Sequence, residues 1–171
     1  MHSAKFYRFA LLVAFTMVTA CTHLPDSRPT AQPIPEPVRT ETRINNTGNE
    51  IALRALALVG KPYRYGGADL QGFDCSGLVY FIHDALGLKV PRTAAEQQRA
   101  ALNIGKPQLQ PGDLLFFKTT SGPQVSHVAI YVGENRFVHA PRSGMLIELR
   151  SMNDSYYATR LISMGRLHPI T

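Results

Sequence analysis

The sequence predicts an α+β fold in which helices come first and an antiparallel sheet follows. Apolar residues recur at helical spacing near the start of the globular part, and two later segments begin with side chains typical of helix N-caps. Beyond residue 112, short apolar runs alternate with Gly, Pro, Asn and Ser, as strands and turns do. The 171 residues, 44% of them hydrophobic, suffice for one globular domain with appendages.

Residues 1–20 have the form of a bacterial secretory signal. Lys5 and Arg8 precede an apolar run over residues 9–18, and small residues follow before Cys21. The run is shorter than the ~20 apolar residues that a membrane-spanning helix needs. The stretch MVTAC resembles a lipobox, whose cysteine becomes the lipidated first residue of the mature protein, which would attach it to a membrane. An ordinary cleaved leader in which the cysteine is incidental is the alternative.

Residues 21–48 are predicted to form an extended tether between the anchor and the domain. Five prolines stand there among polar residues: Pro25, Pro29, Pro33, Pro35 and Pro37. Proline-rich chains extend by about 3 Å per residue, so the segment could reach several nanometres. A spacer of no particular length is the alternative. Thr22 stands where an aspartate retains enterobacterial lipoproteins in the inner membrane, so we expect outer-membrane attachment facing the periplasm of a Gram-negative bacterium.

Charge and cysteine count exclude several classes of function. The formal net charge of +6 falls to +4 without residues 1–20, which hold two basic residues and no acidic one. The basic residues are scattered and do not interleave with aromatics, so nucleic acid is not expected as a partner. A mildly basic surface suits a carboxylate-rich partner, although solubility explains it equally well. Two cysteines in different contexts allow neither a metal ribbon nor a disulfide framework.

The globular domain is expected to span residues 49–171 and to open with a helix. Asn49 is a suitable N-cap, the run EIALRALALV carries apolar residues at helical spacing, and Gly60 ends it. The following stretch, KPYRYGGADLQGFD, is rich in glycine and aromatics and has no sustained period. It is predicted to be a loop.

Asp74 is predicted to cap a second helix over residues 75–86, which Gly87 ends. Cys75 then lies in the first helical turn, where unsatisfied amide hydrogens and the helix macrodipole favour a negative charge. Because a thiol is nucleophilic as its thiolate, this position predicts a lowered pKa for Cys75. An isolated cysteine is nevertheless more often a small, inert, buried side chain.

A third helix is predicted over residues 93–102, with Thr93 as N-cap and Glu96 completing a capping box. Five short apolar runs then predict strands: residues 113–117, 124–132, 136–140, 145–149 and 160–167. The short GEN turn between the second and third runs predicts a β-hairpin.

His127 and His139 fall on the two strands of that hairpin, within a couple of residues of direct opposition. A thiol followed by two histidines is typical of a nucleophile, its base and a group that orients the base. The arrangement requires the Cys75 helix to pack on the sheet, so that His127 reaches the thiol and His139 holds its imidazole in the productive tautomer. A histidine on a strand, taken alone, is usually structural.

The segments PYRYGG, DCSGLV, PGDLLFF, SHVAIYVG and FVHA together resemble the NlpC/P60 family of papain-like cysteine peptidases of the bacterial cell wall. The resemblance covers residues 51–167 in the family's order and spacing. It implies a papain-like domain with Cys75 as nucleophile, His127 as general base and His139 as the orienting residue.

The resemblance also assigns three further residues. Tyr63 matches a tyrosine that lines the active site of the family and helps to hold the oxyanion. Asp74 and Ser76 match positions that contact the peptide in some relatives, and both are equally suited to capping the helix.

The reaction implied by the resemblance is hydrolysis of peptide bonds in peptidoglycan stem peptides, with no metal or organic cofactor. We expect the protein to be a monomer. A lipoprotein with one catalytic domain resembles enzymes that cut the D-alanyl to meso-diaminopimelate cross-link. Relatives with the same triad cut the D-glutamyl to diaminopimelate bond instead. A non-catalytic cell-wall-binding lipoprotein and a transferase or amidase are further alternatives. The complete triad, with the cysteine before both histidines, favours a peptidase.

Overall fold

The computed structural model describes residues 39–167, with side chains described from residue 47 onward. The predicted signal, Cys21 and the proline-rich part of the tether lie outside these residues, so lipidation and membrane attachment stay predictions. None of the helices among the described residues is long and apolar enough to cross a membrane.

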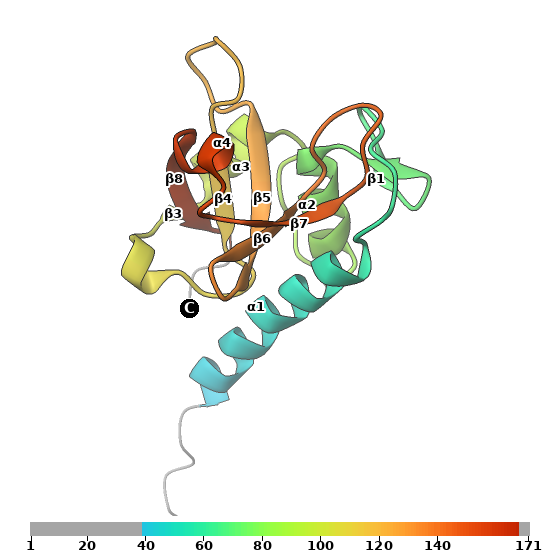
Figure 1. Cartoon of the computed structure of the whole chain (residues 1–171). Coiled ribbons are helices and arrows are strands. Elements are labelled where there is room, and N and C mark those ends of the chain that lie inside the picture. The colour runs from blue at the N-terminus through green and yellow to red at the C-terminus, as the bar shows by residue number, and fades with distance from the viewer. Residues whose placement is uncertain (1–38, 168–171) are drawn as a thin grey trace, which may run out of the picture. The chain divides into compact units, whose positions relative to one another are not determined.

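The structure has the predicted α+β architecture (Figure 1). The helices are α1 (Arg39–Ala57), α2 (Cys75–Asp84), α3 (Ala94–Ala100) and α4 (Ser155–Ala158), with a 3-10 turn, η1 (Lys106–Gln108). The larger sheet is antiparallel, in the order β3-β8-β4-β5-β6-β7. Its strands are β3 (Leu102–Asn103), β4 (Leu114–Phe117), β5 (His127–Gly133), β6 (Arg136–His139), β7 (Glu148–Ser151) and β8 (Leu161–Arg166).

The first helix begins earlier than predicted. α1 starts at Arg39, so the predicted cap Asn49 lies within the helix and the last part of the predicted tether is helical. Gly48 misled the prediction because a glycine among polar residues resembles a linker. In the structure a Cβ at Gly48 would overlap the carbonyl oxygen of Pro111, so the glycine lets the helix touch the loop before β4.

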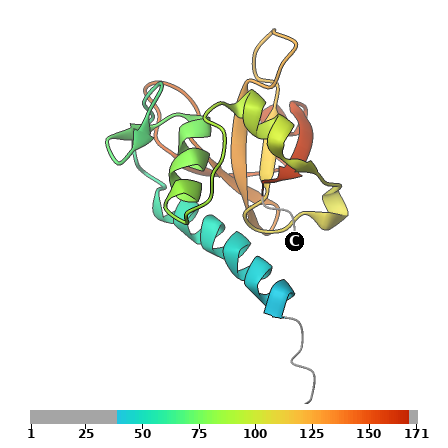
Figure 2. The ribbon, with the colours of Figure 1, turned by 180° about the vertical axis from the view of Figure 1, so that it is seen from behind.

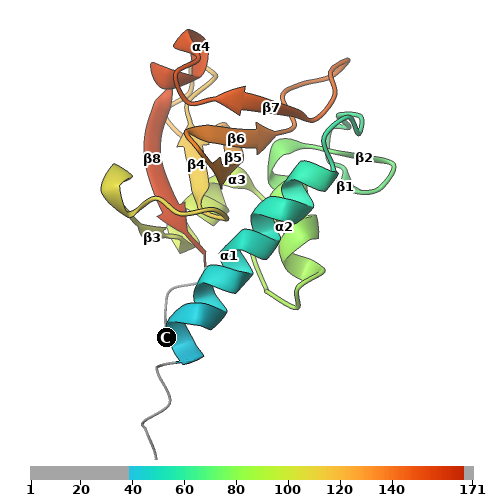
Figure 3. The same ribbon diagram turned by 60° about the horizontal axis from the view of Figure 1, so that its bottom comes forward.

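Helices cover the two faces of the larger sheet unequally. α1 and α2 lie side by side against β5 on one face, with α3 next to α2 (Figures 2 and 3). This face carries the main core, which includes Phe73, Leu78, Ile82, Leu114, Phe116, Val128 and Ile130. The other face packs a second cluster of Leu115, Phe117, Ala129, Phe137 and Met152, with Tyr157 of α4 against it. Both histidines belong to strands between these two clusters.

The remaining elements follow the sequence with local differences. The predicted capping box of α3 is present, and Gly87 adopts a left-handed φ of 72° after α2. The predicted loop before α2 contains a small hairpin, β1 (Ala68–Asp69) with β2 (Gly72–Phe73). β7 lies three residues later than predicted, while β3 and α4 were not predicted. Elements of two to four residues are too short for periodicity to reveal.

The predicted hairpin of β5 and β6 is confirmed, with residues Gly133, Glu134 and Asn135 of its turn at positive φ. Ile130 lies opposite Val138 and Tyr131 opposite Phe137. In this register, the residue of β5 that would face His139 lies two positions after His127. This offset agrees with the prediction that the two histidines lie within a couple of residues of direct opposition.

Candidate active site

Cys75 is the first residue of α2, as predicted. Asp74 is extended, with φ −88° and ψ 176°, and its Oδ1 accepts a hydrogen bond of 2.6 Å from the Gly77 amide. This bond satisfies one of the free amide hydrogens at the helix start and fixes the backbone conformation there, and so the position of Cys75 in the first turn. Cys75 is a free thiol, half-buried against the main core.

The pKa of the Cys75 thiol is raised, contrary to the predicted lowering. Burial is the largest cause, and the neighbouring Asp74 carboxylate adds to it. Hydrogen bonds from the backbone amides of Val128, Ser76 and Cys75 itself act in the opposite direction without outweighing burial. The Cys75 thiol is therefore neutral at rest.

The Val128 amide links the thiol to β5, the strand that begins with His127. Val128 directly follows His127, the first residue of β5. Among the described residues no hydrogen bond joins the Cys75 sulfur to the His127 ring itself. Such bonds are often long in unliganded sites, so the juxtaposition of thiol and strand is the informative feature.

The two histidines form a buried pair. His127 Nε2 and His139 Nδ1 are 2.9 Å apart, and the rings meet edge to face with centroids 5.0 Å apart. His127 is 5% exposed and His139 is fully buried. Burial, and then the proximity of His139, lowers the pKa of His127 to about 3. Burial, and then the Arg150 charge, lowers the pKa of His139 to about 3. Both imidazoles are neutral at neutral pH.

Tyr157 of α4 shields this pair and was missed by the sequence analysis. Its ring lies 4.8 Å from that of His139 and 6.2 Å from that of His127, edge to face with the former. Phe117 and Phe137 complete the aromatic surroundings. Since no periodic pattern marks the four-residue α4, only the aromatic pair Tyr156 and Tyr157 could have indicated a packed segment.

Tyr63 is close enough to Cys75 for the charge of the thiolate to act on its phenol, and its role at the oxyanion stays a prediction. Both residues pack against the main core, and the Tyr63 amide donates to Met145 O over 2.9 Å. Burial, followed by the charges of Cys75 and Asp74, raises the pKa of Tyr63. The phenol is therefore a hydrogen-bond donor at neutral pH.

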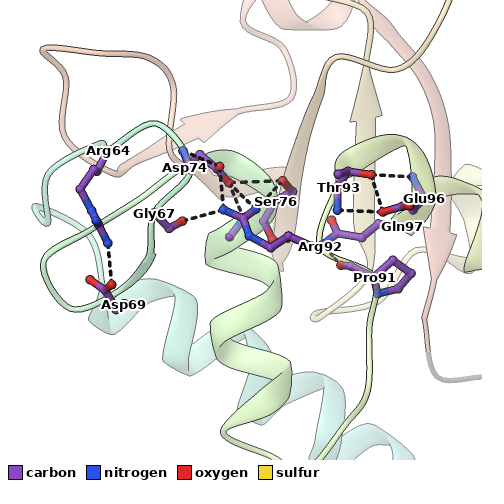
Figure 4. Close-up of polar contacts among 12 residues, drawn as sticks. Arg64, Gly67, Asp69, Asp74, Ser76, Pro91, Arg92, Thr93, Glu96 and Gln97 are labelled. Carbon is purple, nitrogen blue, oxygen red and sulfur yellow. Dashed lines mark hydrogen bonds and ion pairs between the residues drawn. The ribbon is translucent and has the colours of Figure 1, made fainter.

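Asp74 and Ser76 are held by Arg92, a residue that the sequence analysis did not single out (Figure 4). Arg92 binds both Asp74 oxygens, over 2.9 and 2.8 Å, and also donates to Ser76 Oγ over 3.1 Å and to Gly67 O over 3.2 Å. Burial raises the pKa of Asp74, but hydrogen bonds from Arg92 and the Gly77 amide outweigh it and keep the pKa low. The arrangement confirms Asp74 as a cap, and peptide contact by either residue stays a prediction.

Gly77 allows this network to close. A Cβ at Gly77 would overlap the carbonyl oxygen of Gly67 and lie 3.0 Å from Arg92 Nη2 and from Asp74 Oδ1. We expect Gly77→Ala to lower the free energy of unfolding by about 3 kcal/mol or more, since backbone must move to relieve the overlap. Urea unfolding of the full chain measures this. Gly122→Ala, where the nearest atom is 3.9 Å away, should change stability by less than about 0.5 kcal/mol. Equal effects of the two substitutions would contradict the explanation.

Other features of the described residues do not form part of this site. No group of three or more His, Cys, Asp or Glu there could hold a metal ion. A cavity of about 310 Å³ lies between α3 and β8 and is lined by none of the predicted site residues.

Comparison with known proteins finds relatives that are named as peptidases. The chain is 40% identical over 113 residues to Murein DD-endopeptidase MepH of Escherichia coli, covering 64% of this chain and 42% of that protein. It is 35% identical over 121 residues to the Gamma-D-glutamyl-L-lysine dipeptidyl-peptidase of Bacillus subtilis, covering 70% and 41%. The match thus spans about two fifths of each relative.

A solved structure shares the fold. An NlpC/P60 family protein from Bacillus cereus superposes with a TM-score of 0.67 at 32% identity, over 71% of this chain and 40% of that one. The sequence model of the NlpC/P60 family matches residues 60–166. This range includes Tyr63, the Cys75 helix and both histidines. This chain therefore belongs to the NlpC/P60 family.

Proposed function

We propose that this protein is a cysteine peptidase that hydrolyses peptide bonds in peptidoglycan. The observation that carries the proposal is the thiol of Cys75, placed at a helix start against the strand that begins with His127. His127 is in turn bonded to His139. These contacts support Cys75 as nucleophile, His127 as base and His139 as the group that orients the base.

In the proposed reaction the neutral thiol gives its proton to His127 as the sulfur attacks an amide carbonyl. His127 Nε2 is engaged with His139, which leaves Nδ1 for this proton. The imidazolium then protonates the leaving amine, and water hydrolyses the thioester. The Cys75 amide and Tyr63 stabilise the oxyanion, a type of contribution worth about 10²–10³ in rate.

We propose the D-alanyl to meso-diaminopimelate cross-link as the bond that is cut. Support comes from the 40% identity to a relative named as a DD-endopeptidase. The 35% identity to a relative named as a Gamma-D-glutamyl-L-lysine dipeptidyl-peptidase favours the second candidate, the D-glutamyl to diaminopimelate bond.

Digestion of purified meso-diaminopimelate peptidoglycan by the full-length protein tests both statements, with products resolved by mass. Loss of cross-linked dimers in favour of tetrapeptide monomers is the expected result. Dipeptide stems left on the glycan would instead show that the D-glutamyl to diaminopimelate bond is cut. A folded protein that releases neither product would overturn the peptidase proposal in favour of a cell-wall-binding role.

A further inference from the structure

A carboxylate stands behind the histidine pair and takes no part in the roles assigned above. Glu148 begins β7 directly opposite His139 of β6. Its Oε1 lies 3.2 Å from His139 Nε2. Glu148, His139 and His127 thus form a line of hydrogen bonds that ends next to Val128, whose amide bonds to the Cys75 sulfur.

The Glu148 carboxylate is held in this position by its neighbours. Arg150 Nε donates to the same oxygen over 2.8 Å, and Arg150 Nη1 lies 3.6 Å from Asp154. The groups facing the His139 ring are therefore Glu148 and Arg150 of β7, Asp154 and Tyr157 at α4, and His127 of β5. Tyr157 covers the ring at 4.8 Å and His139 is fully buried, so bulk water does not reach the His139 ring, although the Glu148 side chain is itself 24% exposed.

The carboxylate determines where the protons of both histidines lie. An ionised carboxylate only accepts hydrogen bonds, so His139 must carry its proton on Nε2 and present the Nδ1 lone pair to His127. His127 must then carry its proton on Nε2, because it donates to that lone pair over 2.9 Å. The Nδ1 lone pair of His127 is left free to accept the thiol proton.

We propose that Glu148 is a positioning residue that sets the tautomers of His139 and His127 and so makes His127 Nδ1 the base. The inference rests on the proposed function. During attack the S–H bond breaks, the proton forms an N–H bond at His127 Nδ1, and the sulfur electrons form the bond to carbon. The π electrons of the attacked carbonyl group move onto its oxygen, which becomes the oxyanion.

The tautomers can be measured directly by nitrogen-15 NMR of the wild-type full chain without substrate. Both histidines are expected to carry hydrogen on Nε2 and a lone pair on Nδ1. A proton on Nδ1 of His139 in the wild type would overturn the inference without any variant being needed.

Variants then test the connection to rate. Glu148→Met keeps the length of the side chain but removes the acceptor, and should lower kcat about 10-fold or more with KM little changed, together with a mixture of tautomers. Glu148→Gln should restore most of the rate, because its amide oxygen accepts from His139 while Arg150 donates to it. Glu50→Met removes an equivalent carboxylate, paired with Arg54 on α1, and should leave rate and tautomers unchanged.

The two proposals fail separately. Wild-type kcat and tautomers in a folded Glu148→Met would overturn the role of Glu148, even if peptidoglycan is cleaved. A Glu148→Gln variant as slow as Glu148→Met would also overturn the role of Glu148. The loss of kcat would then come from the missing charge or from altered packing, and not from the missing hydrogen-bond acceptor. A digest without products would overturn the peptidase proposal whatever tautomers are observed.

Discussion

Replacing Cys75 with alanine is expected to reduce peptidoglycan cleavage by at least about 10⁴-fold while leaving the domain folded. The remaining residues cannot form the thioester, and loss of a nucleophile removes nearly all the rate that its group of residues supplies together. Stability should change little, since the side chain is half-buried and small. Release of peptides from meso-diaminopimelate peptidoglycan, followed by chromatography, measures the loss.

Cys75→Ser is the matched control for packing, because oxygen replaces sulfur in the same position. It should be nearly as inactive as Cys75→Ala, since a hydroxyl is a far weaker nucleophile than a thiol beside a neutral imidazole. Thermal unfolding of both variants should lie close to that of the wild type. Substantial cleavage by a folded Cys75→Ala would refute the assignment of the nucleophile.

Much of the site could be predicted because its local signals are carried by consecutive residues. The cap at Asp74, the capping box at Thr93 and the hairpin of β5 and β6 each depend on a few neighbours in sequence. Once these elements were fixed, Cys75 necessarily stood at a helix start and the two histidines on adjacent strands. The NlpC/P60 motifs then added the order of roles.

The contacts that could not be predicted depend on how separate elements pack or pair with one another. Arg92 reaches back to Asp74 across a helix, and Glu148 meets His139 only because β7 pairs with β6 in one register. A shift of that register by a single residue would turn Glu148 to the other face. No pattern in the sequence fixes a register at that accuracy.

The thiol pKa shows how a correct local prediction can give a wrong electrostatic result. The helix start does supply amide donors to Cys75, as expected. However, α2 packs that end of the helix into the core, and desolvation of a thiolate outweighs the donors. Burial is a tertiary property, and the position of a residue in its helix does not reveal it.

Replacing His127 with glutamine is expected to reduce cleavage by about 10³-fold or more and to weaken the pH dependence of stability. The loss of rate follows from the loss of the base. The change in stability follows from the lowered pKa of His127, about 3 against 6.5 when exposed. As pH falls below 6.5, the unfolded chain binds a proton that the folded chain does not, so stability present above pH 6.5 is progressively lost.

Urea unfolding at pH 6 and at pH 5 separates this effect from simple loss of packing. Each buried histidine contributes about 1.4 kcal/mol per pH unit to the slope of unfolding free energy in this range. His127→Gln should therefore reduce the wild-type slope by about that amount. His139→Gln should reduce it similarly, since its pKa is also lowered to about 3, yet keep more activity because an amide can still orient His127. An unchanged slope in both variants would mean that the histidines are not buried as neutral groups. A slope reduced equally in both, with cleavage lost only in His127→Gln, would separate the base from the residue that orients it.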